Sequence, residues 1–158
     1  MLTQSEADAL FVMPKKPKSA DRLTFPHAGG KLLAEFVSLD DREVFLFNIN
    51  RASIAVSKCT YQKRARQVEI LRRLDIGGSP HPNPLVETVP LEFLVPYNGL
   101  EIPCPHLHVY VEGFAGKWAI PAPSNLMNSD ADLYTVMESF LRYCNVQEMP
   151  NIERGLFI

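Results

Sequence analysis

The sequence predicts a single α+β domain over residues 1–158, with a strongly curved antiparallel sheet of about six strands and a helix at each end of the chain. A barrel-like closure of that sheet is the alternative form. Helical patterns lie near the two chain ends, and strand patterns separated by turn residues fill the middle. A length of 158 residues with 46% hydrophobic content suits one core, so we expect one folding unit.

The N-terminal residues predict a short helix. Thr3 followed three residues later by Glu6 is a capping-box pattern, in which each side chain can pair with the other residue's backbone N–H. We expect this helix to run to about Met13 and to end before Pro14. The polar, proline-containing stretch 15–19 then predicts a surface linker.

Strand patterns begin in the next third of the chain. Two runs rich in apolar residues, 31–37 and 43–49, flank the turn residues 40–42 and predict a hairpin. The second run is apolar on both faces, which is typical of a central strand. Residues 53–60 are ambiguous, and residues 67–74 favour a strand over a helix.

A loop and further strands follow. Residues 75–84 contain three prolines and two glycines, which exclude regular structure. Residues 89–95 then resemble a strand, and Asn98-Gly99 is a hairpin turn signal. We expect two more strands at 106–112 and 117–120.

Apolar residues at helical spacing predict a C-terminal helix packed on the core. Its apolar stripe consists of Leu133, Val136, Met137, Phe140, Leu141 and Cys144. Asn128 or Ser129 can cap this helix, with Asp130 and Asp132 in the first turn, where the helix dipole favours negative charge. Residues 155–158 predict a tail docked on the sheet or an oligomer contact.

The charges are unevenly distributed. The chain has 16 basic and 18 acidic residues, yet the segment 51–73 holds seven basic residues against one acid. A basic surface on an acidic protein is a common footprint of polyanion binding, and a basic ribbon paired with the acidic remainder is the alternative. Both interpretations stay open.

The cysteines and the N-terminus bear on location. Cys59, Cys104 and Cys144 are odd in number, widely spaced and without a CxxC pair, so we expect reduced thiols. Apolar runs fall short of the ~20 residues that span a bilayer, and the N-terminus lacks the layout of a signal peptide. We expect a cytoplasmic protein without a membrane partner.

The predicted strand at 106–112 carries the candidate site. Alternation along a strand places His106, His108, Tyr110 and Glu112 on one face and apolar residues on the other. Two imidazoles, a phenol and a carboxylate are costly to bury on one strand face. This face is therefore the part of the chain with the strongest functional content.

Acid–base chemistry on RNA, without a metal or other cofactor, is the leading hypothesis. Cleavage by the RNA's own 2′-hydroxyl needs one group to take a proton, another to give one, and cations to hold the phosphate. We therefore predict a small ribonuclease of toxin or defence type. The catalytic candidates are His106, His108, His81 and Tyr110, and the phosphate-binding candidates are Lys63, Arg64, Arg66 and Lys117.

Metal binding is one alternative. The spacing of His106, His108 and Glu112 is similar to the first metal-binding motif of cupins, which implies a divalent transition metal. The second cupin motif contains a further histidine, and the sequence has none after His108. A further ligand would have to come from His81, His27 or Cys104.

A non-enzymatic protein of a phage or mobile element is the other alternative. Such a protein would bind and inhibit a nucleoprotein or an enzyme through the basic segment and the apolar C-terminus. Its histidines would then be structural groups that donate hydrogen bonds to backbone carbonyls in proline-rich corners.

Several motifs together resemble an uncharacterised family of small bacterial proteins, a domain of unknown function with some members associated with mobile elements. The motifs are Leu71-Arg72-Arg73-Leu74-Asp75 with Gly78, His81-x-Asn83-Pro84, Pro105-His106-Leu107-His108-x-Tyr110-x-Glu112-Gly113 and Lys117-Trp118-Ala119-Ile120-Pro121. The resemblance covers residues 43–145 and implies no activity. Residues 84–99 are longer than the family pattern, which leaves the position of His81 relative to His106 open.

Overall fold

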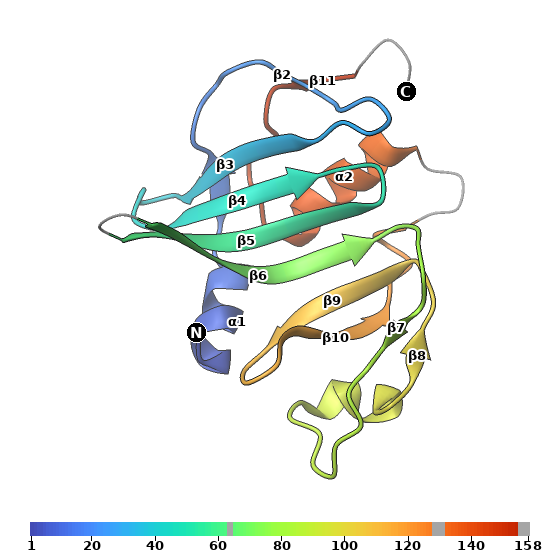
Figure 1. Ribbon diagram of the computed structural model, residues 1–158. Coiled ribbons are helices and arrows are strands. Elements are labelled where there is room, and N and C mark those ends of the chain that lie inside the picture. Colours follow the sequence, from blue (N-terminus) through green and yellow to red (C-terminus); the bar gives the residue numbers. More distant parts are fainter. Residues whose placement is uncertain (63–64, 128–131, 155–158) are drawn as a thin grey trace.

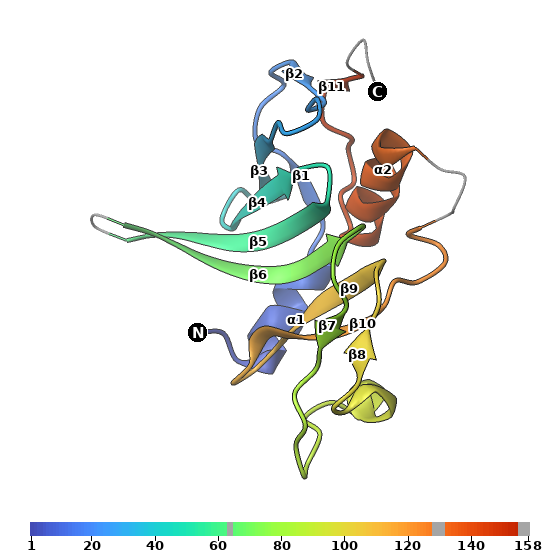
Figure 2. The same ribbon diagram turned by 45° about the vertical axis from the view of Figure 1, so that its right-hand side comes forward.

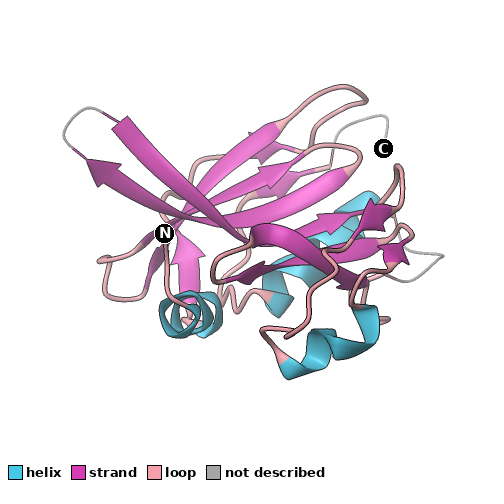
Figure 3. Cartoon of the chain, turned by 60° about the horizontal axis from the view of Figure 1, so that its bottom comes forward, coloured by secondary structure: helices cyan, strands magenta, loops and turns pink. Residues whose placement is uncertain are grey.

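A seven-stranded antiparallel sheet forms the centre of the protein. The computed structural model describes residues 1–62, 65–127 and 132–154. Within these ranges the strand order is β1-β3-β4-β5-β6-β9-β10, and each neighbouring pair is antiparallel. The strands are β1 Lys15–Pro17, β3 Leu32–Ser38, β4 Val44–Ile49, β5 Ser53–Gln62, β6 Ala65–Asp75, β9 His106–Val111 and β10 Ala115–Pro121. The α+β class is confirmed, and the twisted sheet stays open instead of closing into a barrel (Figures 1 and 3).

In the described ranges, two helices and several short elements surround the sheet. The helices are α1 Gln4–Val12 and α2 Leu133–Tyr143, with a 3-10 helix, η1, at Glu92–Tyr97. The short strands are β2 Leu23–Thr24, β7 His81–Pro82, β8 Glu101–Ile102 and β11 Ile152–Glu153, paired as β2 with β11 and β7 with β8. β7, η1 and β8 lie on one excursion of the chain between β6 and β9 (Figure 2). Among the described residues, no helix has the length and apolar character needed to cross a membrane.

The ends of both long helices follow the sequence signals in part. Thr3 and Glu6 form the predicted capping box at the start of α1. The N-cap of α2 is Asp132, whose carboxylate accepts from the backbone N–H of Thr135. Asn128 and Ser129, the predicted caps, lie outside the described residues. The apolar stripe of α2 is buried against the sheet, where Phe140 lies 6.4 Å from Phe47 of β4 between ring centroids.

Three sequence predictions are wrong. Residues 75–84, expected to lack regular structure, include the last residue of β6 and the short strand β7, which pairs with β8. Residues 15–17 form the edge strand β1 instead of a linker, because they pair with β3. Residues 89–95 were predicted as a strand, but from Glu92 onward they belong to η1, since Pro90 within the segment and Pro96 after it lack the backbone N–H groups that a strand ladder uses. Leu94 anchors η1 in the core, where it is fully buried.

Lys15 is a fully buried cation that connects the ends of both helices. Its ammonium donates to the backbone carbonyls of Phe11 at 2.7 Å, Met13 at 2.9 Å and Cys144 at 2.8 Å. The same ammonium lies 4.7 Å from the centroid of the Phe45 ring. Carbonyls at helix C-terminal ends have no intrahelical donor, so Lys15 satisfies groups that would otherwise be unpaired.

Replacing Lys15 with Met is expected to destabilise the protein by about 2–3 kcal/mol at pH 7, because three carbonyls lose their donor. Burial lowers the pKa of Lys15 from 10.5 to about 8. The folded protein therefore releases this proton before the unfolded chain does, and wild-type stability relative to the variant rises from pH 8 to pH 10.5. Urea unfolding of both proteins at pH 7 and pH 10 measures the difference, and a difference that narrows at pH 10 would contradict the assignment.

The outer edge of β10 is covered by side chains from the excursion. Asn83 accepts from the backbone N–H of Ala119 at 2.8 Å and donates to its carbonyl at 2.8 Å. It also donates to the carbonyl of Tyr97 in η1 at 3.1 Å. The His81 imidazole donates to the carbonyl of Lys117 at 2.7 Å. The two side chains thus occupy the place of a further strand and hold the excursion against the sheet.

Candidate functional site

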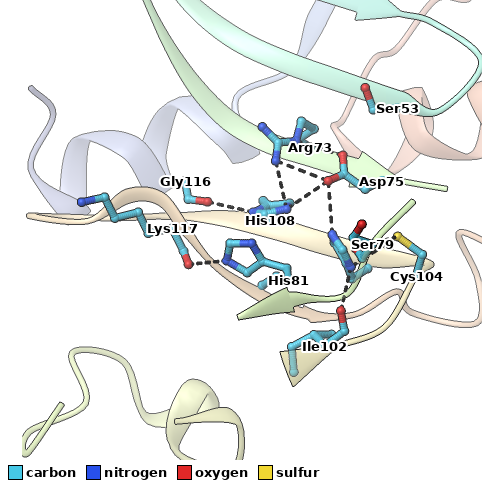
Figure 4. A network of polar contacts seen from close by, with 12 residues as sticks. Ser53, Arg73, Asp75, Ser79, His81, Ile102, Cys104, His108, Gly116 and Lys117 are labelled. Atoms are coloured by element: carbon cyan, nitrogen blue, oxygen red, sulfur yellow. Dashed lines mark hydrogen bonds and ion pairs between the residues drawn. The ribbon is translucent and has the colours of Figure 1, made fainter. Parts of the chain in front are cut away.

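The site is built on two adjacent strands. In the antiparallel pairing of β6 with β9, Arg73 lies opposite His108 and Asp75 lies opposite His106. Because side chains alternate along a strand, these four residues share one face of the sheet. The excursion that follows Asp75 returns His81 to the same place (Figure 4).

Backbone carbonyls hold one nitrogen of each buried imidazole. Nδ1 of His106 lies 2.9 Å from the carbonyl oxygen of Ile102, and Nδ1 of His108 lies 2.8 Å from that of Gly116. A carbonyl oxygen only accepts, so both Nδ1 atoms carry a hydrogen. In a neutral ring the lone pair is then on Nε2, and both rings are fixed in orientation.

The two Nε2 atoms meet at one carboxylate oxygen. Oδ2 of Asp75 lies 3.2 Å from Nε2 of His106 and 3.1 Å from Nε2 of His108. With both rings neutral, three acceptor atoms face one another, and an ionised carboxylate has no hydrogen to share. The contact between Nε2 of His106 and Oδ2 of Asp75 is complete only when a proton or a metal ion lies between the two atoms, whereas Nε2 of His108 also has the Arg73 guanidinium 3.0 Å away. Asp75, His106 and His108 also form a metal-ligand group whose ligand atoms lie within 4.8 Å of one another.

Arg73 supplies positive charge at the rim of this group. Its Nε donates to Oδ1 of Asp75 at 2.9 Å, and its Nη2 lies 3.3 Å from Oδ2 and 3.0 Å from Nε2 of His108. Burial by itself would raise the pKa of Asp75, but hydrogen bonds from His108, when its Nε2 carries a proton, and from Arg73 outweigh burial and lower the pKa to about 2. Asp75 is therefore ionised at neutral pH.

His81 joins the other two imidazoles. Its ring centroid lies 4.5 Å from that of His108 and 5.9 Å from that of His106. Burial lowers the pKa of His81, and the neighbouring histidines lower it further. Nearby, burial and the Asp75 carboxylate raise the pKa of the Cys104 thiol, so this cysteine stays protonated at neutral pH. The three imidazoles therefore lie close together. This establishes the position of His81 relative to His106, which the length of residues 84–99 had left open.

The other predicted site residues lie elsewhere. The hydroxyl of Tyr110 contacts the backbone of Leu2 ahead of α1, and Glu112 accepts from the backbone N–H of Gln4. His106, His108 and Glu112 thus do not converge as a ligand set. Glu112 binds the N-terminal segment, and Asp75 of β6 lies beside the two histidines instead. The ammonium of Lys117 points away from the imidazoles, and only its carbonyl faces His81 (Figure 4).

Arg73 is the member of the basic segment 51–73 that contacts the histidines, whereas the predicted phosphate-binding Arg66 and the neighbouring Arg72 do not. Arg66 and Asp75 lie at opposite ends of β6, nine residues or ~30 Å apart at the usual rise of a strand. Lys63 and Arg64 lie outside the described residues. Arg72 faces the opposite side of the sheet from Arg73, with its guanidinium 4.0 Å from the centre of the Phe11 ring.

The side chains of the site differ in exposure. The side chains of His106 and His108 are only 2% and 3% exposed, whereas Asp75 is 21% and Arg73 is 35% exposed. Among these four side chains, contact with solvent is therefore concentrated at Asp75 and Arg73.

Sequence reasoning missed Asp75 and Arg73 as members of the site. Both are polar residues two positions apart at the end of a strand, directly before a loop rich in proline and glycine. The alternation that grouped His106 with His108 also groups this pair, but only the strand register brings the two groups together.

A profile of a family of unknown function, DUF6978, matches residues 2–146. The chain belongs to DUF6978. The prediction of an uncharacterised family is thereby confirmed. No curated protein and no solved structure matches the chain. The matched range includes Arg73, Asp75, His81, His106 and His108, and the family description assigns them no activity.

Proposed function

We propose that this DUF6978 protein binds a divalent transition metal through Asp75, His106 and His108. The observation that carries the proposal is the convergence of both Nε2 atoms on one carboxylate oxygen while both Nδ1–H groups are held by backbone carbonyls. Metal-bound histidines usually donate their second N–H in this way, which fixes the ring and its tautomer.

The spacing of the ligand atoms agrees with one ion. Two atoms bound ~2.1 Å from a metal at right or tetrahedral angles lie ~3.0–3.4 Å apart. The Nε2-to-Oδ2 distances of 3.2 Å for His106 and 3.1 Å for His108 fall in this range. Two histidines and one carboxylate suit Zn²⁺, Fe²⁺, Co²⁺ or Mn²⁺ and leave coordination positions for water or a substrate.

Chemistry at such a centre follows from its open positions. A bound metal lowers the pKa of a coordinated water and polarises a carbonyl or phosphoryl oxygen. The exposed side of Asp75 and Arg73 gives a small substrate access to those positions. Hydrolysis or another metal-assisted reaction on a small molecule is the reaction class that open metal positions beside Asp75 and Arg73 would support.

Titration with Co²⁺ tests the proposal. Protein freed of metal by chelator and dialysed should bind one equivalent of Co²⁺, with a visible absorption spectrum of a nitrogen- and oxygen-ligated ion. Zn²⁺ should displace it, and bound metal should raise the thermal midpoint. A protein that takes up no Co²⁺ or Zn²⁺ at millimolar concentration would refute the metal centre.

Metal-free acid–base action on RNA is the second candidate. It is favoured by the Arg73 guanidinium, which contacts Nε2 of His108 at 3.0 Å and could hold a phosphate beside an imidazole. Labelled RNA incubated with the protein in excess chelator tests it. Cleavage that persists in chelator and disappears in His106→Ala would favour this candidate over the metal centre.

A further inference from the structure

The guanidinium of Arg73 and a metal ion would use the same lone pair. Because Nδ1–H of His108 is engaged by Gly116, the lone pair of the neutral ring lies on Nε2. Arg73 directs Nη2 at this atom from 3.0 Å. A guanidinium keeps its charge at any ordinary pH, so it cannot give way to a metal by losing a proton.

The position of Arg73 also opposes a second cation by charge. Nη2 lies 3.3 Å from Oδ2 of Asp75, the oxygen on which both histidines converge. An ion bound at this oxygen would lie within a few ångströms of the guanidinium, where like charges repel strongly. Arg73 must therefore withdraw Nη2 before His108 can ligate a metal. Its Nε can keep the 2.9 Å hydrogen bond to Oδ1, so that it remains attached to the ligand set.

We propose that Arg73 is a resident cation that competes with the metal for His108 and so sets the metal concentration at which the site fills. This inference rests on the proposed metal centre. In the metal-free protein the guanidinium neutralises Asp75 and holds His108 in place. In the metal-bound protein it supports the ligand Asp75 and leaves an N–H group at the open side of the site, where it is 35% exposed.

The chain offers a closely matched control. Arg72 precedes Arg73 on β6, carries the same charge and lies on the opposite face, over the Phe11 ring. Replacing either arginine with glutamine lowers the net charge by one, so an effect of net charge alone on metal affinity would be the same in both variants. Only the Arg73 variant removes the competing contact with His108.

Co²⁺ affinity measured against a competing chelator tests the inference. Arg73→Gln is expected to bind Co²⁺ at least ~10-fold more tightly than wild type, because the competing charge is removed. Arg73→Met, a second neutral variant, should behave in the same way if the glutamine variant folds poorly. Arg73→Lys should stay closer to wild type because it retains the charge, and Arg72→Gln should match wild type. Circular dichroism of each metal-free protein establishes that it is folded.

The outcomes separate the two proposals. Metal binding by wild type with equal or weaker binding by Arg73→Gln and Arg73→Met would overturn the role of Arg73 and leave the metal centre standing. No metal binding by the wild type would overturn both proposals.

Discussion

Asp75→Asn is expected to weaken metal binding by at least ~100-fold while the protein stays folded. The amide has nearly the shape of the carboxylate, but it lacks the negative charge and presents an NH₂ group to one side. Asp75 supplies the oxygen that lies 3.2 Å from Nε2 of His106 and 3.1 Å from Nε2 of His108. Loss of that charge leaves two neutral imidazoles beside the Arg73 guanidinium, which is a poor environment for a dication.

Glu112→Gln is the matched control for this prediction. The Glu112 carboxylate accepts from the backbone N–H of Gln4 and does not reach the imidazoles. Co²⁺ titration of both variants should show a large loss for Asp75→Asn and wild-type affinity for Glu112→Gln. Weakened binding by Glu112→Gln with wild-type affinity in Asp75→Asn would favour Glu112 as the carboxylate ligand and would exclude Asp75.

Asn83→Ala is expected to destabilise the protein by about 3–4 kcal/mol, because a buried backbone group left without its partner costs about 1–3 kcal/mol. The Asn83 side chain makes three hydrogen bonds to main-chain groups of Ala119 and Tyr97. It is 7% exposed, so water does not readily replace these partners. Urea unfolding monitored by Trp118 fluorescence measures the loss.

Asn98→Ala provides the comparison, since Asn98 makes a similar pair of hydrogen bonds to the N–H and carbonyl of Val86 at 3.0 Å and 2.9 Å. Asn98 is only partly buried, and water can take over part of its role. We expect a cost of about 1 kcal/mol. Equal losses in the two alanine variants would show that burial does not decide the contribution of Asn83.

Local patterns in the sequence predicted most of the fold. The Thr3–Glu6 capping box, the apolar run at 43–49 and the apolar stripe of the last helix depend on residues close in the chain, and the structure confirms them. The edge strand at Lys15 was missed because its pairing with β3 and its contact with Cys144 join distant segments. Residues 89–95 were mistaken for a strand because their apolar content was given more weight than Pro90 within the segment and Pro96 after it.

The candidate site was predicted only in half. Alternation correctly grouped His106 with His108, since both belong to one strand. Asp75 and Arg73 belong to another strand, and a single sequence contains no signal for the register that places them opposite the histidines. Tyr110 and Glu112 share the parity of the histidines, but the N-terminal segment covers that end of β9. The roles in RNA cleavage that the sequence suggested stay predictions.

The side chains along the outer border of β10 have a consequence for self-association. An edge strand without a partner exposes unpaired backbone N–H and C=O groups. These groups can pair with an extended segment of another chain, which leads to aggregation. Asn83 and His81 already engage Ala119 and Lys117 on that border. A foreign segment must first detach both side chains, and removal of His81 disturbs the imidazole group as well. Resistance to misassembly and the integrity of the histidine cluster therefore depend on the same few hydrogen bonds.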